Sequence, residues 1–137
     1  MKLNAMLGVM AALLAVISSP AHSHHSFAVF DLSKTVVFKG TLKDLQWTNP
    51  HVLIWVETDP SAGKAAETWT AELTSPGNLT RLGWTKRSLK PGDRVEVVVN
   101  PLRDGSHGGG FQKATLVSTG QVLTSNLRAA VTTGAKP

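Results

Sequence analysis

Histidine is the residue type in this chain whose number and spacing best suit chemistry. The 137 residues include five histidines and no cysteine. Three of the histidines lie close together near the N-terminus and two stand apart, namely His22, His24, His25, His51 and His107. Because a neutral imidazole binds copper, zinc and nickel, the N-terminal group is a candidate metal site. For the two isolated histidines, the simpler interpretations are a rim residue bonded to backbone and a surface residue.

The segment before this group has the features of a secretory signal peptide. Lys2 precedes an apolar run from Ala5 to Ile17, and small residues follow. The run is shorter than the about 20 residues that a membrane-spanning helix needs, and no later stretch is long enough. Cleavage after Ala21 or after Ser23 fits the pattern. We predict residues 1–23 to be a signal peptide and the remainder to be a soluble periplasmic or secreted protein.

The point of cleavage decides how copper could bind. If cleavage follows Ala21, His24 becomes the third residue, and the amine, two amides and the imidazole could hold Cu(II) in a square plane. If it follows Ser23, His24 is terminal and its amine and ring could chelate the ion. We predict a metal site of His24, His25 and His51, if the arm packs beside the turn before His51, with copper as one candidate ion. The alternative is a polar arm that binds metals opportunistically.

The geometry around His51 depends on two strands that meet at a proline. The apolar run from Val52 to Val56 follows the Asn49–Pro50 turn, and its composition is typical of a strand covered on both faces. In the preceding strand the apolar positions change face beyond Leu42. This change predicts a one-residue bulge, next to a bend that Gly40 permits.

Alternation of apolar residues and the placement of turn residues predict the other elements. The expected strands are 35–47, 51–59, 67–73, 94–100 and 111–118, with 121–123 as an extension of the sheet. Ser75, Pro76 and Gly83 predict the start and end of a short helix. Residues 104–110, which carry His107, are expected to form a flexible glycine-rich loop.

This element order is that of an OB-fold, a five-stranded Greek-key barrel. We therefore predict an all-β protein with a small OB-fold-like barrel of five to six antiparallel strands over residues 24–124. The short helix lies between the third and fourth strands. Residues 125–137 are small and polar, and we expect a flexible tail there.

The chain also carries four tryptophans, Trp47, Trp55, Trp69 and Trp84. Filling the core is the default role for such large rings. At the mouth of a barrel, however, tryptophans can also form a floor on which a flat or apolar ligand stacks. The candidate ligand-binding residues on this interpretation are Trp47, Asn49 and Trp55.

The formal net charge is +5, a mild basic excess that favours weak attraction to anions. Four cations could form one basic edge, namely Lys86, Arg87, Lys90 and Arg94. This edge is either a solvated surface or, with the tryptophans, part of a surface that binds a small ligand or a polymer. Nucleic-acid binding agrees with the fold but not with export, and we do not expect it.

The sequence gives little support for an enzyme. There is no cysteine nucleophile, and no serine stands in a Gly-x-Ser-x-Gly elbow. Glu57, Glu67 and Glu72 lie on predicted strands, and nothing singles out an acid–base pair among them. The residues favour a non-enzymatic binding or accessory protein, with a small hydrolase as a weaker alternative.

Several short motifs occur together, namely His-His-Ser-Phe-Ala at 24–28, Trp-Thr-Asn-Pro-His-Val at 47–52, Gly-Trp at 83–84 and Leu-Lys-Pro-Gly-Asp at 89–93. In this order they resemble a bacterial family of small exported proteins known as a domain of unknown function. The resemblance extends from His24 to about Leu123. It implies a periplasmic OB-like barrel and no particular activity. It also directs attention to the residues that match its motifs, namely His24, His25, Trp47, Asn49, Pro50 and His51.

Overall fold

The computed structural model describes residues 27–61 and 63–125. The predicted signal peptide, the three N-terminal histidines and the predicted tail beyond Ser125 lie outside these residues. In the described part of the chain, no helix is long and apolar enough to cross a membrane.

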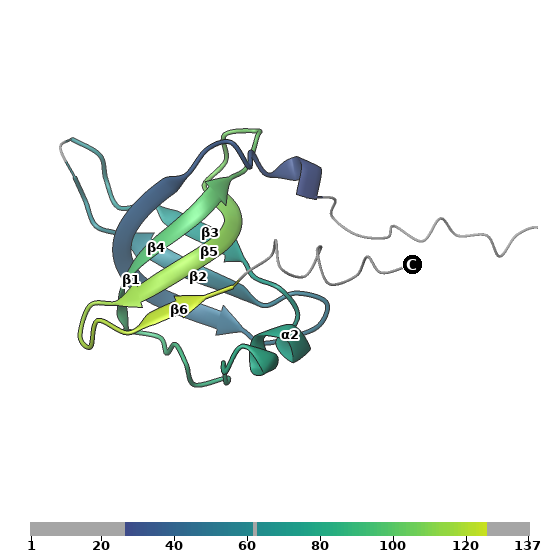
Figure 1. Ribbon diagram of the computed structural model, residues 1–137. Helices are drawn as coiled ribbons and strands as arrows, with labels where there is room; N and C mark the ends of the chain where they lie inside the picture. Colours follow the sequence, from purple (N-terminus) through teal and green to yellow (C-terminus); the bar gives the residue numbers. More distant parts are fainter. Residues whose placement is uncertain (1–26, 62, 126–137) are drawn as a thin grey trace, which may run out of the picture.

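Six strands form one sheet, in the order β3-β2-β1-β4-β5-β6, and an additional pairing of β3 with β5 closes the first five into a barrel (Figure 1). The strands are β1 (Val36–Gln46), β2 (Leu53–Thr58), β3 (Thr68–Glu72), β4 (Arg94–Pro101), β5 (Gly108–Leu116) and β6 (Val122–Thr124). A single 3₁₀ turn, η1 (Phe27–Val29), precedes them, and a short helix, α2 (Pro76–Arg81), separates β3 from β4. The predicted all-β fold, a small OB-like barrel with one helix after the third strand, is confirmed.

The closing pair differs from the prediction of antiparallel strands, because β3 and β5 run parallel, with Thr70 opposite Gly108 and Glu72 opposite Gly110. The other pairings in the sheet are antiparallel. A ring of five strands cannot alternate direction all the way round, since five is odd. One parallel pair is therefore required. It is the pair of β3 and β5, the two strands at the ends of the order β3-β2-β1-β4-β5.

The bulge in β1 lies where the sequence places it. The register with β2 shifts between Leu42 and Asp44, so that Leu42 pairs with Val56 and Asp44 pairs with Trp55. Gly40 pairs with β2 on one side and with β4 on the other. A Cβ atom at Gly40 would collide with the carbonyl oxygen of Glu57. Glycine is required here because the backbone of β2 at Glu57 and Thr58 approaches too closely for a side chain.

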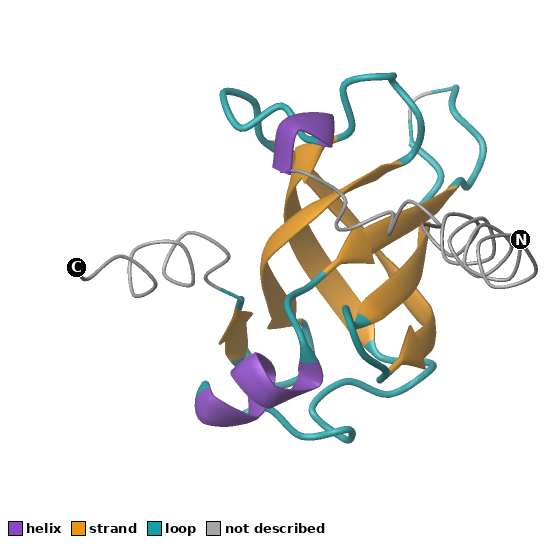
Figure 2. Cartoon of the chain, turned by 90° about the vertical axis from the view of Figure 1, so that its right-hand side faces the viewer, coloured by secondary structure: helices purple, strands orange, loops and turns teal. Residues whose placement is uncertain are grey.

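The core consists of the inward side chains of the barrel strands, including Val52, Ile54 and Val56 of the β2 segment, which are fully buried. The apolar run was predicted to be covered on both faces, and this is wrong for the outer face. Leu53 and Trp55 alternate with the buried residues and are only half-buried. The barrel has one interior, and α2 lies at one end of it, with η1 at the opposite end (Figure 2).

The helix and the loop after it cap that end. Ser75 is the N-cap of α2, with its Oγ accepting a hydrogen bond from the backbone N–H of Asn78 at 3.3 Å, and Pro76 occupies the first turn. Beyond the helix, Trp84 and Leu89 are 2% and 1% exposed. The indole Nε1 of Trp84 donates to the carbonyl oxygen of Thr124 at 2.9 Å. The predicted helix thus forms, and together with the loop after it covers one end of the barrel.

The glycine-rich segment predicted to be a flexible loop is shorter than expected. Gly108, Gly109 and Gly110 are buried and form the start of β5. A Cβ atom would lie 2.7 Å from a Leu102 side-chain carbon at Gly108 and 3.2 Å from the Phe30 ring at Gly110. The glycines are therefore explained by close packing and not by flexibility.

We expect Gly40→Ala to lower the free energy of unfolding by about 2–3 kcal/mol or more, because the new methyl group meets backbone that cannot move aside. Gly77→Ala is the matched control, since a Cβ atom there meets nothing within 4 Å and alanine is favoured in a helix. Urea denaturation of both variants measures the difference. Equal stability of the two variants would contradict the proposed close approach at Gly40.

Candidate functional site

His51 lies directly after the turn at Asn49–Pro50, whose peptide bond is cis. Two backbone hydrogen bonds fix the chain next to it, from Val52 N–H to the Thr74 carbonyl at 3.2 Å and from Leu73 N–H to the Val52 carbonyl at 2.8 Å. They tie the start of β2 to the end of β3. The side chain of His51 is 32% exposed. It therefore occupies the rim position that the sequence predicts for it, reachable from solvent.

Glu72 is the partner of His51 at this rim. The Nδ1 atom of His51 lies 2.6 Å from Oε1 of Glu72, and the carboxylate side chain is 25% exposed. In the neutral imidazole, Nδ1–H donates to the carboxylate and Nε2 keeps its lone pair. No other hydrogen bond or ion pair joins His51 to a described residue, so Nε2 is available to a ligand on the side away from Glu72.

Sequence reasoning treated Glu72 only as a strand acid facing outward. The register of the β2–β3 hairpin, in which Leu53 pairs with Glu72, would have identified Glu72 as the partner of His51. Leu53 is two residues from His51, so both lie on the same outer face. The register could not be fixed from the sequence because a long connection, residues 59–67, joins the two strands.

The first described residues of the chain run close to this pair. Phe30 forms an antiparallel bridge with Leu102, and Asp31 N–H donates to the Pro101 carbonyl at 2.8 Å. The ring of Phe30 lies over Gly110, which is the strand partner of Glu72. Paired residues of adjacent strands are about 4.8 Å apart. The segment that follows the predicted arm therefore lies one strand away from Glu72.

His107 forms a second and separate pair. Its Nε2 lies 3.4 Å from Oε2 of Glu67, and its ring stacks on Trp69 with centroids 5.4 Å apart. Trp69 in turn packs against Phe38 with centroids 4.9 Å apart. The imidazole of His107 is thus on the surface, as predicted, and also forms one end of an aromatic row. Among residues 27–61 and 63–125, no group of three or more His, Cys, Asp or Glu side chains is placed to hold a metal ion.

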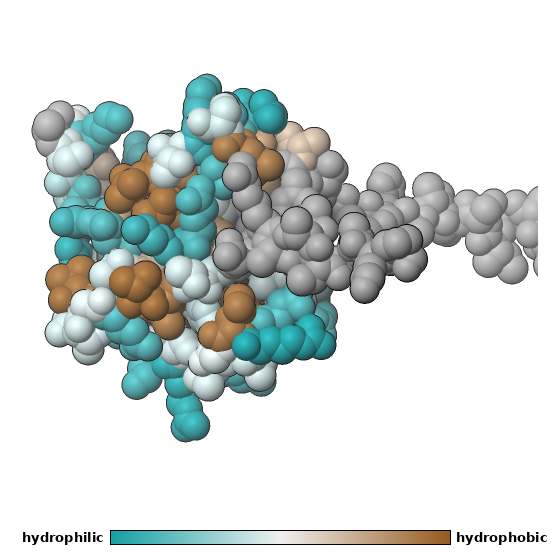
Figure 3. Space-filling view, viewed as in Figure 1, coloured by the Kyte–Doolittle hydropathy of each residue, from teal (hydrophilic) through white to brown (hydrophobic). Residues whose placement is uncertain are grey.

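The predicted ligand-binding residues lie in different surroundings. Trp47 is partly buried and packs against the core, whereas Asn49 is exposed at the turn. Trp55 lies on the outer face of β2, opposite the fully buried Ile54 and Val56. On the face drawn in Figure 3, the hydrophobic side chains of the described residues form separate patches among polar ones. Trp47 thus packs against the core from the turn after β1, whereas Trp55 lies on the outer wall of β2.

Arg94 does not belong to the predicted basic edge. Its guanidinium donates to Oδ1 of Asp59 at 2.7 Å and to Oγ1 of Thr41 at 3.0 Å, and it also reaches the second carboxylate oxygen. These hydrogen bonds hold the pKa of Asp59 below its usual value. Arg94 starts β4 and points across β1 to the end of β2, so its charge is neutralised on the barrel wall.

Together, the observations define a small closed β-barrel with a solvent-accessible histidine–carboxylate pair beside its first hairpin turn. The chain belongs to the family of unknown function DUF6152, whose model matches residues 11–112. The resemblance to a domain of unknown function is thereby confirmed. Comparison with curated proteins gives no match, and comparison with solved structures gives none either.

The positions of the tryptophans lead to a stability prediction. We expect Trp84→Ala to cost about 3–5 kcal/mol, because Trp84 is fully packed and hydrogen-bonded. Trp55→Ala should cost about 1 kcal/mol, because the ring lies on the outer face and stays half in water. Urea denaturation monitored by circular dichroism checks both values. A Trp55 variant as unstable as the Trp84 variant would mean that the outer ring has a structural role.

Proposed function

We propose that this protein is an exported, periplasmic or secreted binding or accessory protein that captures a divalent transition-metal ion, with copper as the leading candidate. The observation that carries the proposal is the pairing of His51 with Glu72 at 2.6 Å. The export part rests on the sequence, in which Lys2 and the apolar run from Ala5 to Ile17 precede the histidines.

The histidine–carboxylate pair resembles the arrangement found around metal-binding histidines. Such a histidine usually donates its second ring N–H to a carboxylate, which fixes the tautomer, orients the ring and makes the other nitrogen a better ligand. Here the Nδ1 atom of His51 faces Glu72, which leaves Nε2 as the donor for the ion. The partial exposure of both side chains leaves room for an ion and for further ligands.

One imidazole is too few for tight binding, and we propose that His24 and His25 supply the remaining donors. His25 lies two residues before Phe27, where η1 begins, and an extended chain of two residues spans about 7 Å. Phe30 lies over the strand neighbour of Glu72. The chain that follows the arm thus passes one strand from Glu72, which supports a site shared by the arm and His51. The freed amine of the processed chain would add a nitrogen donor.

The proposal predicts that the processed chain binds about one Cu(II), measured by isothermal titration calorimetry with a competing chelator. Glu72→Gln should weaken binding by about 10–100-fold, because the ring loses its orienting carboxylate. His51→Ala should weaken it further, and His24→Ala and His25→Ala should each reduce it. His107→Ala is the matched control and should leave the affinity unchanged.

Two results would contradict the proposal. If His51→Ala and Glu72→Gln bind copper as the parent chain does, the barrel contributes nothing to the site. If His24→Ala and His25→Ala have no effect, the arm is not a ligand.

The export part of the proposal has its own test. Intact mass spectrometry of the protein from a periplasmic extract should show a chain that begins at residue 22 or 24, and an uncleaved cytoplasmic chain would contradict export.

A second candidate function is the binding of a small ligand or a polymer through Trp47, Asn49 and Trp55. It is favoured by the half-buried position of Trp55 on the outer wall of β2, a face that OB-folds use for ligands. In this case, indole fluorescence should change on titration with an aromatic or sugar ligand and should not change in Trp55→Phe. A flat response across a panel of ligands would exclude this function.

A further inference from the structure

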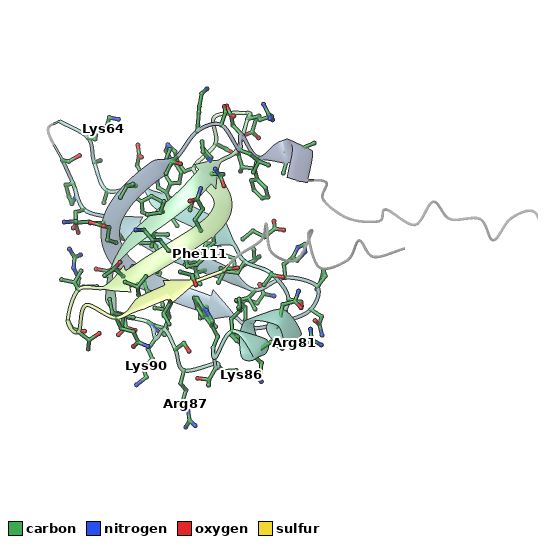
Figure 4. All side chains as sticks on the ribbon, in the orientation of Figure 1. Lys64, Arg81, Lys86, Arg87, Lys90 and Phe111 are labelled. Atoms are coloured by element: carbon green, nitrogen blue, oxygen red, sulfur yellow. The ribbon has the colours of Figure 1, made fainter. Side chains whose placement is uncertain are left out.

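The end of α2 and the connection from α2 to β4 carry a cluster of cations, which we call the basic lobe. It consists of Arg81, Lys86, Arg87 and Lys90, all of them exposed. Residues 75–92 contain no aspartate and no glutamate. In the described part of the chain, none of these four side chains forms an ion pair. Figure 4 shows all four at one end of the molecule, pointing away from the barrel.

Three cations on or beside the barrel strands are, in contrast, paired with carboxylates. Lys39 pairs with Glu96 at 3.4 Å, Lys43 pairs with Glu57 at 3.4 Å, and Arg94 is held by an aspartate. The basic lobe alone accounts for +4 of the formal net charge of +5, which leaves +1 for the remainder of the chain. Among the described residues, the excess of positive charge thus lies in the lobe, where it attracts anions.

The backbone of the lobe is held in place. Trp84 and Leu89 are buried on either side of the central cations. Thr85 N–H donates to Ser88 Oγ at 2.8 Å, and Lys90 N–H donates to an Asp93 carboxylate oxygen at 2.8 Å. The charged side chains therefore project from a fixed turn. A partner that binds them has little backbone to order, which favours binding.

An exposed aliphatic side chain accompanies these charges. Leu82, directly after Arg81, ends the helix and is 50% exposed. Cations beside an exposed leucine are the combination with which peripheral proteins hold anionic lipids, since the charges meet phosphates and the aliphatic group enters the interface. We propose that the basic lobe docks on the surface of an anionic phospholipid membrane. This interaction is independent of the metal site, because neither His51 nor Glu72 belongs to the lobe.

The composition of the lobe favours a membrane over a polymer. The four cations lie along one end of the molecule, where an extended anionic surface can meet them (Figure 4). Proteins that hold single-stranded nucleic acids or sugars combine such charges with exposed aromatic rings. The aromatic residue of segment 75–92 is Trp84, which is buried and hydrogen-bonded. The lobe therefore lacks a stacking platform.

Co-sedimentation with lipid vesicles tests the proposal on the processed chain without residues 1–23, because the apolar run from Ala5 to Ile17 would enter lipid by itself. One set of vesicles contains phosphatidylglycerol and the other contains only phosphatidylcholine. Subtracting the protein bound to the second set from that bound to the first leaves the binding that depends on lipid charge. We expect binding to the anionic vesicles, with most of it lost at about 0.5 M salt. Lys86→Gln/Lys90→Gln should reduce the affinity by about tenfold or more. Leu82→Ser should reduce the binding that persists in high salt.

Lys64→Gln/Lys113→Gln is the matched control. It removes the same charge from lysines that lie outside the lobe and form no ion pair with a described residue, and it should change the affinity by less than about twofold. Equal losses in the two double variants would overturn the proposal, because net charge alone would then explain binding. Binding to a soluble polyanion such as dextran sulfate without binding to anionic vesicles would also overturn it. Unchanged circular dichroism of each variant shows that folding is preserved.

Discussion

The parallel pairing of β3 with β5 is the constraint on which the rest of the structure depends. It closes a ring of five strands that could not otherwise close, and it places Glu72 opposite Gly110. Side chains on Gly108 and Gly110, at the start of β5, would meet Leu102 and Phe30, which pack beside this seam. Phe30 fills the space above Gly110. One seam thus joins the N-terminal segment, the end of β3 and the site around His51.

Local features of the fold could be predicted from the sequence because their physical causes are local. Alternating apolar residues indicate which face of each strand is buried, and the change of face beyond Leu42 requires the bulge that the register shows. Ser75 and Pro76 set the start of the helix by their own chemistry. In each case the residues that cause the structure are neighbours along the chain.

Features caused by distant residues could not be predicted in the same way. A run of glycines indicates a flexible loop unless Leu102 and Phe30 are known to occupy the space beside it. Glu72 is one outward acid among several until the hairpin register brings it to His51. Arg94 belongs to a basic edge by sequence, but Asp59 lies close enough in space to neutralise it. Register and closure decide these contacts, and both are properties of the assembled barrel.

The way the lobe is anchored has a consequence for how this protein can change. Trp84 and Leu89 hold the turn from the inside, whereas the cations on that turn contribute nothing to the packed interior. In this short segment, the exposed cations therefore determine the affinity for a surface, and the buried Trp84 and Leu89 determine the stability of the barrel. Its charges can be exchanged, increased or reversed without a loss of fold, so the molecule can adapt to a new surface while its architecture stays the same.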